Sequence, residues 1–173
     1  MINEYKDMTI GSGTKNHKKG YLLLLAVLLA SIILSIGLGI FVIINKSLIL
    51  ASTGRDSQFA FYAADSGIEC ALYWDRRHAG FSTGVFATST GSLPPSSGVL
   101  CNSADIASSW TISNQTANTA DTAFNMAFAN GTCTTVTVKK SDSGLTTRLE
   151  AFGFNTCNTQ SPRRIERAVR VRY

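Results

Sequence analysis

An apolar run of 24 residues, Tyr21 to Ile44, constrains this chain more than any other feature. It contains no charged side chain and is dominated by Leu, Ile and Val. About 20 such residues are enough for a helix to cross the hydrocarbon core of a bilayer. A secretory signal peptide has a shorter apolar core, of about 7 to 15 residues, followed by a small-residue cleavage site. The run therefore predicts a membrane-spanning helix and argues against removal by signal peptidase.

The charges around this run predict its orientation. Lys15, Lys18 and Lys19 precede it, whereas the first charge after it is Lys46. Short cytoplasmic segments carry an excess of Lys and Arg, so we expect a cytoplasmic N-terminus and place everything after about Asn45 outside the cytoplasm. The rest of the 173-residue chain is long enough for one small domain.

The four cysteines, Cys70, Cys101, Cys133 and Cys157, all follow the apolar run. An even set of cysteines outside the cytoplasm predicts two disulfides. Their spacing contains no C-x-x-C pair of the kind that binds zinc. We therefore expect no metal site.

Side chains with catalytic chemistry are sparse. His17 and His78 are isolated in polar surroundings, and the acid pair Asp65 and Glu69 fits a solvated helix edge better than an acid–base pair. No G-x-S-x-G or P-loop motif is present. We expect neither enzymatic activity nor a cofactor.

The apolar run is expected to continue as a helix beyond the membrane, to about Arg77, because no proline interrupts it. Gly37 and Gly39 within the run either allow close helix packing or weaken the helix locally. Apolar side chains in the outer half recur at the spacing of an amphipathic helix: Phe61, Ala64, Ile68, Ala71 and Leu72.

The C-terminal third shows the alternation of β-strands. After a Ser/Thr/Gly-rich connector at 78–121 with one or two short strands, alternating residues begin at Thr122, and Asn130-Gly131 predicts a two-residue type I′ turn. Another turn is expected at 141–144. We predict an α+β fold, in which the long N-terminal helix covers the apolar face of a four-stranded antiparallel meander at 122–173.

These features together resemble type IV pilin or pseudopilin precursors. The resemblance lies in a basic leader ending in KKG, an aromatic residue opening a long apolar helix, and a C-terminal antiparallel sheet. Within that superfamily, QFAFYAADSGIECAL is similar to the helix of PilX-type minor pilins. The motif-level resemblance covers residues 18 to 75, and the remainder is similar in architecture alone.

The resemblance implies a processing site. Lys18 and Lys19 match the basic residues before the scissile bond, Gly20 the glycine that precedes it, and Tyr21 the new terminus, which is commonly N-methylated in this family. Residues 1–20 would then be a cleaved leader. The partners that the resemblance implies are a prepilin peptidase, an inner-membrane assembly machinery and other pilin subunits. The precursor would be held in the membrane, and the mature protein would belong to an extracellular filament or the cell surface.

One position departs from the family. Most major pilins have glutamate five residues into the mature chain, and the corresponding residue here is Leu25. The resemblance assigns that acid a charge contact with a neighbouring subunit's terminal amine, which Leu25 cannot make. We therefore expect a minor or initiating subunit, in which residues 21–48 form the assembly segment of a helix at 21–77.

Two alternatives remain beside this interpretation. The chain is an uncleaved single-pass membrane protein with an extracytoplasmic β domain, or it is a pilus-tip subunit that contacts extracellular DNA. The second rests on a cluster of basic residues near the C-terminus, although an exposed strand whose charge prevents edge pairing is favoured. The cluster consists of Arg163, Arg164, Arg167, Arg170 and Arg172.

The meander suggests a disulfide pairing. It places Cys133 at the start of one strand and Cys157 just beyond the end of its antiparallel partner. We expect a Cys133–Cys157 bond, which leaves Cys70 on the helix to pair with Cys101 in the connector. Four cysteines allow three pairings, and the other two remain open.

Overall fold

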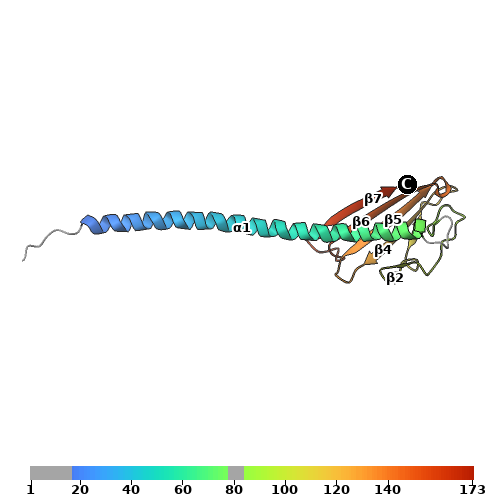
Figure 1. Ribbon diagram of the computed structural model, residues 1–173, viewed down its shortest axis with the longest axis horizontal. Coiled ribbons are helices and arrows are strands. Elements are labelled where there is room, and N and C mark those ends of the chain that lie inside the picture. Colours follow the sequence, from blue (N-terminus) through green and yellow to red (C-terminus); the bar gives the residue numbers. More distant parts are fainter. Residues whose placement is uncertain (1–16, 78–83) are drawn as a thin grey trace, which may run out of the picture. The chain divides into compact units, whose positions relative to one another are not determined.

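The computed structural model describes residues 17–77 and 84–173. The chain divides into two units, Met1–Ile49 and Leu50–Tyr173. Helix α1, His17–Leu72, passes through both units and is followed by a π-helical turn at Tyr73–Arg77 (Figure 1). It is long and apolar enough to cross a membrane, as its sequence predicts.

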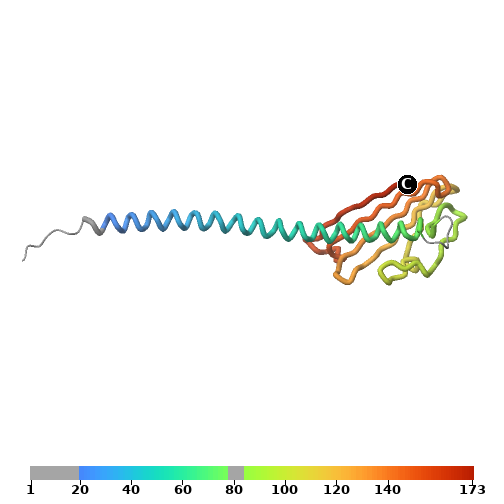
Figure 2. The backbone as a smooth tube through the Cα atoms, viewed as in Figure 1, coloured from blue at the N-terminus to red at the C-terminus, as the bar shows by residue number. Residues whose placement is uncertain are grey.

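A five-stranded antiparallel sheet forms the second unit together with the outer part of α1 (Figure 1). Its strands follow one another in chain order, so that the backbone runs back and forth across the sheet (Figure 2). The strands are β3 Thr111–Ser113, β4 Ala120–Ala127, β5 Cys133–Ser141, β6 Thr146–Phe154 and β7 Glu166–Arg172. A separate two-stranded sheet pairs β1 Leu100–Cys101 with β2 Ala104–Asp105.

The α+β fold class is confirmed, with one difference in the sheet. Strands β4 to β7 are the four expected strands, whereas β3, a short strand within the expected connector, joins the same sheet as a fifth. Its pairing with β4 runs from Thr111 opposite Ala123 to Ser113 opposite Asp121. The short strand extends the sheet because it satisfies backbone groups along the edge of β4.

One face of the sheet is apolar and buried. Phe124 of β4, Val136 and Val138 of β5, and Leu149 and Ala151 of β6 are at most 2% exposed. These buried residues alternate with exposed ones along each strand, and this alternation in the sequence predicted the strands. The outer part of α1 covers this face with the buried residues Ala60, Ala63, Ala64, Ile68 and Ala71. Phe61 was expected on that face and is instead 47% exposed.

Helix and sheet approach each other closely because small residues line the contact. A Cβ atom added to Gly67 of α1 would lie 2.7 Å from Val136 Cγ2 and 2.9 Å from Thr134 Cγ2. A Cβ added to Gly153 of β6 would overlap the Ala60 carbonyl oxygen and the Ala64 nitrogen. The backbone of β6 therefore packs directly against the backbone of α1.

The predicted type I′ turn at Asn130-Gly131 is wrong. Ala127 pairs with Cys133, so five residues connect β4 and β5 instead of two. Gly131 has a φ of 83° and its amide donates to the Phe128 carbonyl, but the φ of Asn130 is not positive. Asn130 instead accepts hydrogen bonds from the amide and hydroxyl of Thr132. The side chain of Asn130 thus stabilises the turn by hydrogen bonds, while its backbone does not adopt the left-handed conformation that a type I′ turn requires.

Candidate functional site

The predicted processing residues lie in the first turns of α1. Lys18, Lys19, Gly20 and Tyr21 are all helical, so the scissile bond predicted between Gly20 and Tyr21 is not extended in this structure. The first four amides of a helix have no partner within it, and this end is the easiest to unwind. Among the residues that the structure describes, none lies within 4 Å of a Cβ added to Gly20, so their packing does not require glycine at this position.

The apolar part of α1 has large hydrophobic side chains exposed on all sides. Their exposed fractions range from 40% at Leu25 to 71% at Leu50. Nothing lies within 4 Å of a Cβ added to Gly37 or Gly39. No packing within the described chain accounts for these residues. A surface of this kind is stable only in a bilayer or against other apolar helices.

The Cys70–Cys101 disulfide is present, as predicted, with its Cα atoms 6.0 Å apart. Cys70 lies in the outer part of α1 and Cys101 ends β1. The indole Nε1 of Trp74 donates to the Leu100 carbonyl at 3.1 Å, beside this bond. Together they attach the irregular segment around β1 and β2 to the helix.

The second predicted disulfide is not formed in the structure. Cys133 and Cys157 are thiols. Their proximity was predicted correctly: Cys133 opens β5, and the Cys157 amide donates to the Gly131 carbonyl at 3.1 Å. Burial, followed by the hydrogen bond with Cys157, raises the pKa of the Cys133 thiol to about 12. The fold brings the sulfurs together, and oxidation is a separate chemical step.

We predict that the Cys133–Cys157 bond forms by thiol–disulfide exchange with a disulfide oxidant such as oxidised glutathione, which is reduced to two thiols as the protein disulfide forms. Spontaneous air oxidation near neutral pH should be slow, because the raised pKa of Cys133 leaves little thiolate to react. Non-reducing peptide mapping should find Cys133 linked to Cys157 beside the Cys70–Cys101 peptide. Recovery of Cys70 linked to Cys133 would contradict the pairing.

A buried ionic network joins the end of the helix to the sheet. Lys140 Nζ lies 2.5 Å from Asp75 Oδ1, and their side chains are 3% and 2% exposed. The Tyr173 hydroxyl donates to Asp75 Oδ2 at 2.7 Å. Burial, and then the hydrogen bond and charge of Asp75, raise the pKa of Tyr173. We did not predict this network from the sequence, although Lys140 continues the inward alternation of Thr134, Val136 and Val138.

The arginine cluster near the C-terminus separates into three places. Arg163 and Arg164 precede β7, and the Arg164 guanidinium stacks 3.6 Å from the centroid of the Phe154 ring. Arg167 lies on the helix side, where its Nε donates to Ser57 Oγ at 2.7 Å. Arg170 and Arg172 lie on the opposite, outer face of the sheet. The five arginines therefore do not form one continuous cationic surface.

A single carboxylate organises the charges on this outer face. Glu150 pairs with Lys139 at 3.1 Å, Arg148 at 2.6 Å and Arg170 at 2.7 Å. Burial alone would raise the pKa of Glu150, but the hydrogen bonds and charges of Lys139 and Arg148 outweigh it and lower the pKa below its usual value. Glu150 is therefore an anion at neutral pH.

Residues 17–77 and 84–173 contain no group of three His, Cys, Asp or Glu side chains placed to hold an ion. His78 lies outside the described residues.

Comparison of the chain with protein-family models, with curated proteins and with solved structures gave no match.

Proposed function

We propose that this chain is a structural subunit of a type IV pilus-like filament, of the minor or initiating kind. The observation that carries the proposal is the apolar part of α1, which has no partner within the described chain. In the sequence this segment directly follows Lys18, Lys19 and Gly20, the residues that resemble a prepilin processing site. A simple membrane anchor would account for the first feature but not for the second.

In the proposed mechanism the membrane holds the precursor through residues 21–48, and a prepilin peptidase cleaves after Gly20 on the cytoplasmic side. Inner-membrane assembly machinery then moves the helix from lipid to the helices of other subunits. Lipid and helix surfaces are similarly apolar, so association depends on close packing more than on the hydrophobic effect. The open surfaces at Gly37 and Gly39 would allow such an approach.

Leu25 is the basis for proposing a minor or initiating subunit. A leucine cannot pair with the terminal amine of a neighbouring subunit, whereas the glutamate of major pilins is expected to do so. An initiating subunit has no subunit ahead of it that requires this contact. Burial of some 20 apolar side chains, each worth about 1.5 to 3 kcal/mol relative to water, keeps the helix out of solvent in either position.

The alternative function is an uncleaved single-pass membrane protein with an extracytoplasmic β domain. The apolar helix is compatible with both functions, and the processing-site resemblance favours the filament subunit. A DNA-binding role is less well supported, because the arginines lie in three separate places and Glu150 neutralises part of their charge.

The experiment that tests the proposal is substitution of Gly20. We expect Gly20→Val to leave the full-length precursor in the membrane, because a branched side chain hinders access to an extended backbone at the scissile bond. The wild-type chain, coexpressed with a prepilin peptidase, should yield a mature protein beginning at Tyr21, as read by N-terminal sequencing and intact mass.

Gly37→Val is the matched control for this experiment. It places the same side chain in the same helix, at a site with no neighbour within 4 Å, and should be cleaved normally. Cleavage of Gly20→Val at the wild-type rate, or a wild-type chain that keeps residues 1–20, would contradict the proposal and favour the uncleaved membrane protein.

The minor-subunit proposal predicts low abundance in filaments. Quantitative mass spectrometry of sheared filaments should find this chain scarce relative to a pilin that carries the acid, and deletion should lower filament number more than filament length. If the chain is the dominant polypeptide, the minor assignment fails and the filament assignment stands.

A further inference from the structure

A row of three basic side chains crosses the outer face of the sheet. Lys139 of β5 is directly opposite Arg148 of β6, which is directly opposite Arg172 of β7. Neighbouring strands lie about 4.8 Å apart, and like charges at directly opposed positions destabilise a sheet. Such a row is stable only where anions offset its positive charge.

The neighbouring carboxylates supply only part of that charge. Glu150 accepts from Lys139 and Arg148 but also from Arg170, so one anion is shared among three cations. Asp121, opposite Lys139, accepts from Asn114 Nδ2 at 2.8 Å. Across residues 17–77 and 84–173, no carboxylate forms an ion pair with Arg172. An excess of positive charge therefore remains at Arg172.

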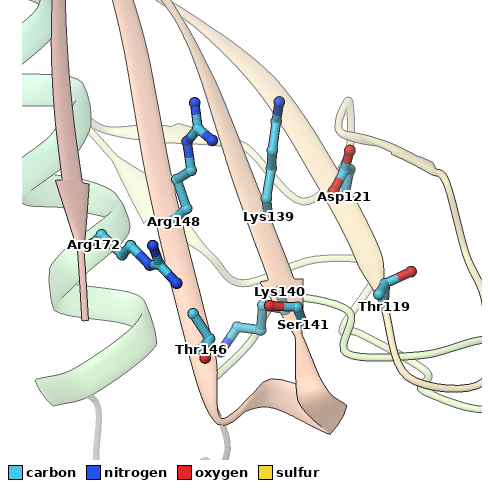
Figure 3. A pocket seen from close by; sticks show the side chains of 8 residues that line it. All are labelled: Thr119, Asp121, Lys139, Lys140, Ser141, Thr146, Arg148 and Arg172. Atoms are coloured by element: carbon cyan, nitrogen blue, oxygen red, sulfur yellow. The ribbon is translucent and has the colours of Figure 1, made fainter.

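A pocket of about 320 Å³ opens beside this row (Figure 3). Arg172 extends from β7 toward β6, while Lys139 and Arg148 extend side by side from their strands (Figure 3). Hydroxyl groups of Ser141, Thr146 and Thr119 lie on the same lining. The Ser141 hydroxyl makes no capping hydrogen bond to the helical turn Asp142–Gly144 that follows it.

We propose that this pocket binds a single tetrahedral oxyanion, a phosphate or sulfate group, through Arg172 and Ser141 with Lys139 and Arg148 at its border. A planar guanidinium donates two parallel hydrogen bonds to such a group, and a serine hydroxyl adds a third. The site is independent of the proposed filament function, because it lies entirely on the second unit of the chain.

The surroundings of the pocket favour a compact anion over an extended polyanion. Asp121 lines the pocket, and Glu150 lies in the next row of the sheet. A nucleic-acid strand lying across the face would bring several phosphates past both carboxylates, whereas one phosphate group at Arg172 is separated from Asp121 by β5 and β6. The group is either free inorganic anion or a phosphate or sulfate carried by a larger molecule.

Thermal unfolding of the full chain in an uncharged detergent tests this site. Inorganic phosphate is added at constant ionic strength, with chloride as the balancing anion, and unfolding is followed by tryptophan fluorescence. A ligand that binds the folded state raises the midpoint saturably. We expect this rise for phosphate and sulfate, and we expect Arg172→Gln to weaken the apparent affinity about tenfold or more.

Arg163→Gln is the matched control, because it removes the same charge from an exposed residue outside the pocket. It should leave the phosphate effect unchanged. Arg172→Lys retains the charge but loses the paired donors, and Ser141→Ala removes one hydroxyl, so both should weaken binding if they fold normally. If Arg172→Gln itself destabilises the folded chain, Arg172→Lys and Ser141→Ala still test whether these side chains bind phosphate.

Further binding measurements distinguish a free anion from a phosphate or sulfate group carried by a larger molecule. Tighter binding of phosphoserine than of inorganic phosphate would indicate an anion carried by a larger molecule, and the reverse order a free anion. A phosphate effect no larger than that of chloride would overturn the proposal. An equal loss on Arg163→Gln, or preferred binding of a short DNA oligonucleotide that depends on Arg163 and Arg172 alike, would also overturn it.

Discussion

Lys140→Met is expected to lower the free energy of unfolding by about 3 to 5 kcal/mol. The substitution leaves the Asp75 carboxylate, 2% exposed, with the Tyr173 hydroxyl and without its cation. A buried charge that loses its partner retains its desolvation cost, so breaking the pair costs more than the pair contributes. Asp75→Asn should destabilise the fold in the same way, because it leaves the buried Lys140 ammonium without its carboxylate.

The double variant Asp75→Asn/Lys140→Met separates charge from packing. It removes both charges and roughly retains the volume, so it should be clearly more stable than the sum of the single effects predicts. Denaturant unfolding of the full chain in detergent measures all three variants. Lys139→Met, one residue along β5 with a side chain 42% exposed, is the control and should change stability by at most about 1 kcal/mol. Additive single effects would show that the two charges are not coupled.

Gly153→Val is the second substitution with a large expected effect. The Cβ of any other residue at 153 would overlap backbone atoms of Ala60 and Ala64, which belong to a helix that cannot yield locally. Overpacking in a core costs about 1 to 3 kcal/mol, and we expect the upper end of that range or more because backbone meets backbone. The helix would have to move away from β6 and would lose its contacts with Val136 and Thr134.

Gly91→Val is the control for this substitution, because nothing lies within 4 Å of a Cβ added at residue 91. Thermal unfolding followed by circular dichroism should show a lower midpoint for Gly153→Val and little change for Gly91→Val. Gly153→Ala should lie between wild type and Gly153→Val. An unchanged midpoint for Gly153→Val would mean that the contact between α1 and β6 is looser than the structure shows.

Several features follow from the sequence alone because they depend on local patterns. A charge-free run of 24 residues is long enough to cross a bilayer whatever the rest of the chain does. The alternation around Val136 and Val138 defines a strand with one buried face, and short turns make consecutive strands neighbours. That topology also places Cys133 close to Cys157, as the sequence predicts.

Other features depend on which distant residues meet, and only the tertiary structure decided them. The five-residue connection at Asn130-Gly131 follows from the register of Ala127 with Cys133, which local turn preferences do not determine. The ion pair of Asp75 with Lys140 and the contact of Gly153 with Ala60 join segments far apart in the chain. The row of Lys139, Arg148 and Arg172 exists because of strand register, since a shift of one residue would move each side chain to the opposite face.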